Sequence, residues 1–170
     1  MNYGYRILFS VGEVGRYISH LDILRTVQRA IKRSRLPIVY SAGFNPTPKM
    51  AFASALPVGI TSESEYLDIA MENEILVSMI QERLNSTLPG GFNVIEVKKL
   101  PDNALPLMTI IKAASYFIDV ISGTPNLAME IEKILEAKTL IVERQLRGRK
   151  KGIKEIEIRK LIYQLEYNEQ

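Results

Sequence analysis

The sequence predicts an α+β fold in which one antiparallel sheet carries helices on one face, in the ferredoxin-like (split βαβ) arrangement. Two observations support this class. Over the first hundred residues, the patterns typical of strands and helices follow in the order strand, helix, strand, strand, helix, strand. After a stretch with two prolines, the order strand, helix, strand, strand begins again. We therefore expect a ferredoxin-like half over residues 1–100, a linker over 101–112 and a second βαββ half over 113–170.

The first half is justified element by element. Residues 5–11 are rich in β-branched and aromatic side chains, which favours a strand. Ser19 is a candidate N-cap with Asp22 three residues later, and the apolar side chains that follow fall on one half of a helix that ends before Pro37. The remaining elements are a second strand at 38–40, a close-packed connection at 50–60, a third strand at 65–71, a helix at 74–88 and a fourth strand at 92–98.

The second half follows the same rules. We expect a strand at 114–121, a helix at 125–137 opened by Thr124-Pro125, and strands at 139–146 and 154–159. Residues 161–167 are candidates to continue the last strand. This repeat has no second helix and no fourth strand, which is expected of a shortened repeat or of a truncated chain.

The chain has no cysteine and a single histidine, His20. Disulfides, thiolate zinc sites, iron–sulfur clusters and cysteine nucleophiles are therefore excluded, and we expect no metal and no cofactor. No apolar run approaches the roughly 20 residues that cross a membrane, and the first residues have the pattern of a strand rather than of a signal peptide. We expect a cytoplasmic protein that does not contact membranes. The sequence predicts no particular oligomeric state.

Charge is spread unevenly, although the net charge is only +3. The balance is +6 over residues 1–60, −7 over residues 61–143 and +4 over residues 144–170. Two basic blocks around an acidic middle indicate either a polarised surface or solvated faces that happen to cluster.

The first helix and the loop after it carry the polar residues that core packing does not explain. At about 100° per residue, the helix places four cations opposite its apolar half; they are Arg25, Arg29, Lys32 and Arg33. Such a stripe neutralises phosphates or is a solvated face. The loop at 41–49, with Gly43 and two prolines, is predicted to be stiff. It offers a ring, an amide and a cation suited to single-stranded RNA, unless the ring is tucked into the core; these are Phe44, Asn45 and Lys49.

Other polar residues allow two interpretations. His20 is an acid–base or phosphate-contacting group, or it packs over the helix cap. Asp22 is not its carboxylate partner, because it lies roughly 160° away around the helix. Glu65 and Asp68 are three residues apart on a predicted strand and therefore face opposite ways, which argues against a catalytic dyad. The basic segment with Arg147, Arg149, Lys150 and Lys151 is a second phosphate contact or a solubilising turn.

Three short motifs give the first half a recognisable signature. They comprise Ser19, His20, Leu21 and Asp22; Ser41, Gly43, Phe44, Asn45, Pro46, Pro48 and Lys49; and Glu65, Tyr66 and Asp68. Residues 16–68 resemble the signature of the uncharacterised radical-SAM-linked proteins, which occur as small free proteins or as a C-terminal domain fused to a radical-SAM enzyme. The resemblance is close over the first hundred residues and loose beyond, mainly at 155–159. It implies a bacterial cytoplasmic protein partnered with radical-SAM or RNA-processing machinery, and any cluster chemistry belongs to the partner.

Three functions are compatible with these observations. The leading hypothesis is a non-catalytic RNA-binding or substrate-presenting accessory module. Its candidate RNA-binding residues are Arg16, His20, Arg25, Arg29, Lys32, Arg33, Phe44, Asn45, Lys49, Arg147, Arg149 and Lys150. An enzyme alternative is metal-independent RNA cleavage, by analogy with CRISPR repeat-processing endoribonucleases built from ferredoxin-like halves. In this alternative His20 is the general acid–base, Tyr17 assists it, and Lys49 stabilises the negative charge of the phosphorane. The third hypothesis is a protein-binding adaptor of a radical-SAM enzyme.

Overall fold

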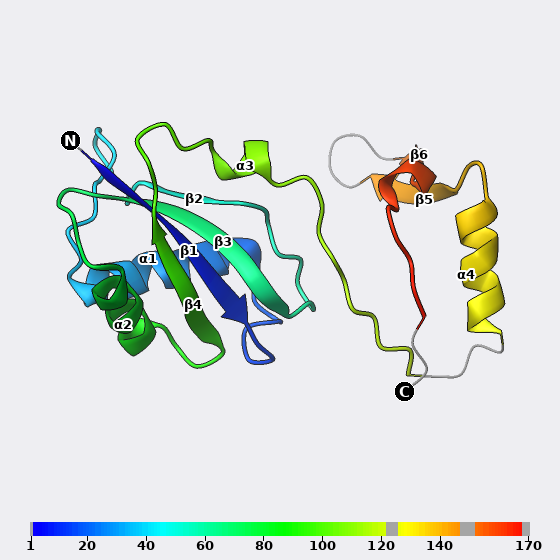
Figure 1. The fold of residues 1–170 in the computed structure, drawn as a ribbon, viewed down its shortest axis with the longest axis horizontal. Helices are drawn as coiled ribbons and strands as arrows, with labels where there is room; N and C mark the ends of the chain where they lie inside the picture. Colours follow the sequence, from blue (N-terminus) through cyan, green and yellow to red (C-terminus); the bar gives the residue numbers. More distant parts are fainter. Residues whose placement is uncertain (1, 122–125, 147–151, 168–170) are drawn as a thin grey trace. The chain divides into compact units, whose positions relative to one another are not determined.

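The structure is a computed structural model that describes residues 2–121, 126–146 and 152–167. It divides into two compact units, Met1–Ala114 and Ser115–Gln170 (Figure 1). The elements of the first unit are β1 (Tyr3–Val11), α1 (His20–Ser34), β2 (Met50–Phe52), β3 (Ser62–Met71), α2 (Val77–Thr87), β4 (Phe92–Lys99) and α3 (Leu107–Ile110).

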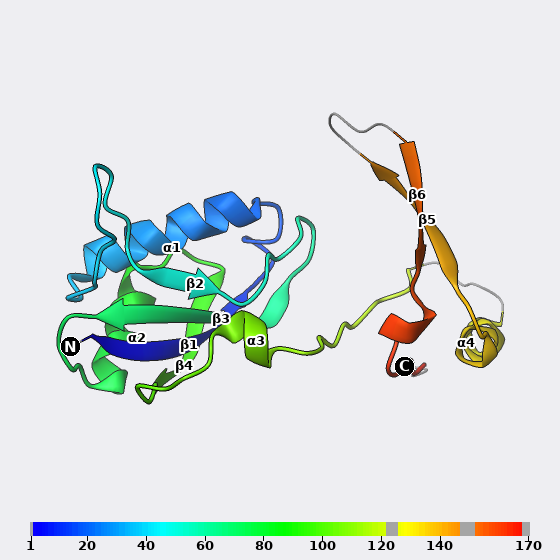
Figure 2. The same ribbon diagram turned by 90° about the horizontal axis from the view of Figure 1, so that it is seen from above.

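The first unit has the predicted fold. Its sheet has the strand order β2-β3-β1-β4, and all neighbouring strands are antiparallel. Alternate residues of β1, from Tyr5 to Val11, are buried together with residues of α1 and α2 in one apolar cluster. Both helices therefore pack on the same face of the sheet, and Figure 2 shows α1 running along it. This is the ferredoxin-like split βαβ arrangement.

The predicted second strand is wrong. Residues 38–40 form only isolated bridges, from Ile38 to Met71 and from Tyr40 to Pro48, whereas β2 lies where a connection was expected. The chain bonds to β3 through Ile38 and Val39, leaves the sheet, returns at Lys49 and then forms the continuous pairing of β2 with β3. Both segments have apolar residues, so the sequence pattern does not distinguish them. The free edge of β3 accommodates one of them as a strand.

The face of the sheet away from α1 and α2 carries an ion pair. Arg6 on β1 donates two hydrogen bonds of 2.8 Å to the carboxylate of Asp68 on β3 and a third, of 3.2 Å, to the carbonyl of Leu105. Leu107, at the start of α3, is buried. Residues expected to form a linker therefore pack on the first unit.

The second unit contains α4 (Leu127–Glu136), β5 (Ile141–Leu146), β6 (Gly152–Glu157) and the 3-10 turn η1 (Arg159–Leu161). The two strands form an antiparallel pair. The strand predicted at 114–121 is wrong, since residues 115–121 have no regular structure and Phe117 and Ile121 are almost fully exposed. An alternating pattern yields a strand only where a sheet edge pairs with it, and in the part of the chain described here β5 and β6 pair with each other. Residues 161–167 do not continue β6 either.

Candidate nucleic-acid interface

A groove separates α1 from the loop that precedes β2. Four side chains of α1 form one wall and four residues of the loop form the other; they are Arg25, Gln28, Arg29 and Lys32, and Tyr40, Pro46, Thr47 and Pro48. The groove has a volume of about 250 Å³ and is open to solvent. It brings together the basic stripe and the proline-containing loop, the two features that sequence reasoning selected separately.

The loop wall is a hairpin-like arm, residues 39–49. At its base Lys49 N donates to Val39 O at 2.7 Å, and further out Ser41 N donates to Thr47 O at 2.8 Å. The Ser41 hydroxyl also accepts a hydrogen bond from Thr47 N at 3.0 Å. Gly43, at the tip, has a φ of 124°, which favours glycine. The arm is attached to β3 because Val39 N donates to Ala70 O and Ala70 N donates to Lys49 O.

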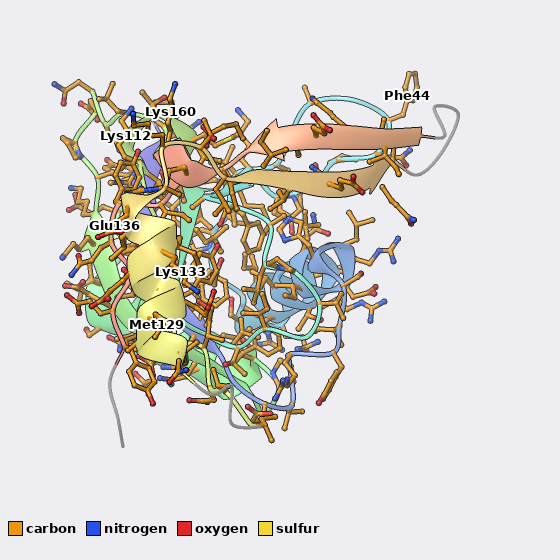
Figure 3. All side chains as sticks on the ribbon, turned by 90° about the vertical axis from the view of Figure 1, so that its right-hand side faces the viewer. Phe44, Lys112, Met129, Lys133, Glu136 and Lys160 are labelled. Atoms are coloured by element: carbon orange, nitrogen blue, oxygen red, sulfur yellow. The ribbon has the colours of Figure 1, made fainter. Side chains whose placement is uncertain are left out.

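Phe44 lies at the tip of the arm and is fully exposed, at 106% of its reference area. Figure 3 shows its ring pointing away from the arm. Asn45 and Lys49 are exposed as well. The interpretation of Phe44 as a core residue is therefore wrong, and the ring is available to a ligand. A large aromatic ring held in water on a hydrogen-bonded arm has no packing role within its own unit.

The cations of α1 are not equivalent. Arg25 pairs with Asp22 at 3.1 Å, and Arg33 donates to the carbonyl of Thr87, at the end of α2, at 2.6 Å. Arg29 and Lys32 are exposed, and no carboxylate of the described residues lies within 4.0 Å of either. The groove thus keeps two unneutralised positive charges.

The start of α1 is a separate region. Ser19 caps the helix by accepting a hydrogen bond from Asp22 N at 3.3 Å, as the sequence predicts. The Ser19 hydroxyl, and secondly the Arg25 guanidinium, lower the pKa of Asp22. Arg16 is engaged before the helix, where it contacts Glu13 at 2.7 Å and the carbonyl of Gly59 at 3.2 Å. Its guanidinium also lies over the ring of Tyr17, 5.1 Å from the centroid.

His20 packs edge-on against Phe52 of β2, with ring centroids 5.4 Å apart. Glu65 of β3 is half-buried nearby. Burial raises the pKa of the Glu65 carboxyl, and the Ser62 hydroxyl and the charge of His20 oppose that shift. Sequence reasoning considered Asp22 as the partner of His20 and missed Glu65. The alternation of the strand could have indicated this position, because residues two apart point to the same face and Glu65 therefore shares the helix-facing side of β3 with the buried Leu67.

The remaining candidates are not gathered around His20. No hydrogen bond joins His20 to Tyr17 or Lys49 in the described part of the chain. Lys49 precedes Phe52 by three residues, a separation of about 10 Å along a strand. Asp68 is on the opposite face of β3 from Glu65 and binds Arg6, in agreement with the spacing. Arg147, Arg149, Lys150 and Lys151 lie outside the described residues.

Comparison with known proteins identifies the family. Residues 4–170 match the family model described as "Uncharacterized protein conserved in bacteria (DUF2344)". The chain belongs to this family. A search among curated proteins found no match.

Among the described residues, no helix has the length and apolar character needed to cross a membrane. Within the same residues, no group of three or more histidine or acidic side chains is placed to hold a metal ion.

Proposed function

We propose that the protein binds single-stranded RNA through the groove between α1 and the arm and acts as an accessory module without catalysis of its own. The observation that carries the proposal is the juxtaposition of Arg29 and Lys32, both without a carboxylate partner among the described residues, with the arm that exposes Phe44. Cations neutralise phosphates, and an exposed ring stacks on an unpaired base.

Single-stranded RNA suits this geometry better than a duplex. Arg25, Arg29 and Lys32 lie along one line of α1 and span about 10 Å of the helix axis, which matches two or three phosphates of one strand. Bases of a duplex are stacked on each other, and a protruding phenylalanine has no base face to contact. A single strand leaves base faces open to Phe44 while its phosphates follow the groove.

The signature at residues 16–68 supports a narrower version of the proposal. Its resemblance to radical-SAM-linked proteins suggests that the module presents RNA to a radical-SAM or RNA-processing enzyme in the bacterial cytoplasm. Any cluster is supplied by that enzyme, because this chain has no cysteine. Co-purification with such an enzyme that survives nuclease treatment indicates direct protein contact. Loss of the enzyme upon nuclease treatment indicates that RNA bridges the two.

The test is filter retention of single-stranded RNA over a salt series. We expect Arg29→Gln/Lys32→Gln to weaken binding about tenfold at low salt and to reduce the salt slope by about 1.4, which is roughly 0.7 for each lost phosphate contact. The matched control is Lys98→Gln/Lys99→Gln, which removes two cations that pair with Glu96 and Glu74 elsewhere in the same unit. Equal losses in both variants would contradict a groove-specific site.

A second test addresses the ring. Phe44→Ala is expected to weaken binding to single-stranded RNA by about 1–3 kcal/mol, the usual contribution of a base–aromatic stack. Protein stability should not change, because the ring contacts solvent. Unchanged affinity in this variant would remove stacking from the proposal and leave only the phosphate contacts.

A second candidate function is RNA cleavage by His20. The observation in its favour is the half-buried Glu65 beside His20, since two titratable groups in different environments are suited to acid–base work. Incubation of labelled RNA with wild type and His20→Ala tests it. Cleavage that disappears in the variant supports catalysis, whereas equal cleavage by both proteins, or none by the wild type, rules it out.

A further inference from the structure

The hairpin of β5 and β6 has an unusual charge pattern. Its register places Glu143 opposite Glu155 and, at the next position, Arg144 opposite Lys154. Successive residues of a strand point to opposite faces. The two glutamates therefore share one face of the hairpin, and the two cations share the other with Val142 and its partner, Ile156.

Like charges at directly opposite positions destabilise a strand pair, because the Cβ atoms are only about 4.5–5.5 Å apart. All four charged side chains are exposed. Neither Arg144 nor Lys154 has a carboxylate within 4.0 Å among the described residues. An isolated two-stranded hairpin is also only marginally stable. The repulsion between the two cations therefore lowers the stability of a hairpin that is already marginally stable.

We propose that the basic hairpin face, made of Arg144 and Lys154 with Val142 and Ile156, is a second binding site for single-stranded RNA. Two neighbouring cations can bind one phosphate or two adjacent phosphates. The negative charge of the bound phosphate then offsets the repulsion between Arg144 and Lys154. The apolar pair beside them offers a surface for a base or ribose. The proposal rests on the proposed function for its ligand, but none of its residues lies in the groove.

RNA fits this face better than an acidic protein segment does. The opposite face presents Glu143 and Glu155, so a polyanion is attracted to one face of the hairpin and repelled from the other. A nucleotide can use both parts of this face, because its phosphate contacts the two cations and its base or ribose contacts the Val142–Ile156 pair. If both units carry a site, one long RNA contacts the same chain twice. The second contact is then intramolecular, which raises the overall affinity for long RNA.

The test uses the full chain and oligouridine of two lengths, about 8 and about 40 nucleotides, the shorter lying within the ~4–16 nucleotides that one binding fold covers. The variant is Arg144→Gln/Lys154→Gln. The matched control, Glu143→Gln/Glu155→Gln, relieves the same kind of repulsion on the opposite face of the same strands. We expect the variant to weaken binding of the long RNA about tenfold and to reduce its salt slope by about 1.4. The control should bind as well as wild type or slightly better.

Each other outcome has a defined meaning. A hairpin variant with wild-type affinity and salt slope for the long RNA overturns the inference, as does an equal loss in the control. Competition by polyglutamate as strong as by RNA assigns the face to an acidic protein instead. A loss in the hairpin variant together with wild-type binding by Arg29→Gln/Lys32→Gln upholds the hairpin site and contradicts the groove. The reverse pattern upholds the groove and contradicts the hairpin site.

Discussion

The two units of this chain differ in what holds them together. In the first unit, seventeen buried side chains form one apolar cluster; fifteen come from three strands and two helices, and Leu36 and Ile38 come from the segment after α1. In the described part of the second unit, no residue is buried, and apolar side chains such as Phe117 and Ile153 face solvent. Hydrophobic burial is the main favourable term in folding. The first unit is therefore held together by a hydrophobic core, whereas the described part of the second unit depends on local hydrogen bonds.

The largest expected difference is in the urea unfolding of the two units prepared as separate fragments. A fragment of residues 1–114 should unfold cooperatively in urea with nearly the midpoint of the full chain, because it contains the whole cluster. A fragment of residues 115–170 should show no cooperative transition. Circular dichroism of the two fragments beside the full chain tests this. A sharp transition in the C-terminal fragment would contradict the comparison.

The next effect compares one substitution in the two units. Ile31→Ala, where the side chain of α1 is 1% exposed, should lower the free energy of unfolding by about 2–5 kcal/mol. Ile153→Ala in β6, where the side chain is 62% exposed, should change it by no more than about 0.5 kcal/mol. Urea titrations of both variants provide the values. A large loss from Ile153→Ala would show that the second unit buries this residue in solution.

The smallest effect is a pH dependence in the first unit. Burial raises the pKa of Glu65, so the folded state holds its proton more tightly than the unfolded state does. Stability is then lost as the pH rises from the ordinary glutamate pKa through the raised one. Glu65→Gln should remove this loss, so the variant should gain stability relative to wild type at pH 7 but not at pH 4. A constant difference at both pH values would show that ionisation of Glu65 is not involved.

Local patterns in the sequence predicted much of the first unit. The Ser19 cap, the apolar half of α1 and the alternation in β1 depend on nearby residues, and the order of such elements along the chain then indicated the split βαβ arrangement. Whether residues 38–40 or residues 50–52 (β2) form the edge strand depends instead on which segment pairs with β3 over several residues. The strand expected at 114–121 failed for the same reason, because its pattern describes a strand without supplying a pairing edge.

The candidate site was predicted in part. Arg29, Lys32 and Phe44 could be selected because charge and backbone stiffness are visible in the sequence. The inclusion of Tyr40 in the groove, and the attachment of Arg33 to the end of α2, follow from how the arm and the helices pack. The proximity of Glu65 to His20 also depends on packing between β3 and the start of α1. Such long-range neighbours have no local signature.

Cross-linking tests the central claim, that RNA contacts the groove and its arm, most directly. Ultraviolet light is applied to the full chain bound to oligouridine, and the protein is then cut with trypsin. Cleavage after Arg35 and Lys49 releases residues 36–49 as one peptide, which contains Tyr40 and Phe44. We predict that this peptide carries cross-linked RNA and that Arg29→Gln/Lys32→Gln reduces its yield. Cross-links found only on other peptides would contradict the account.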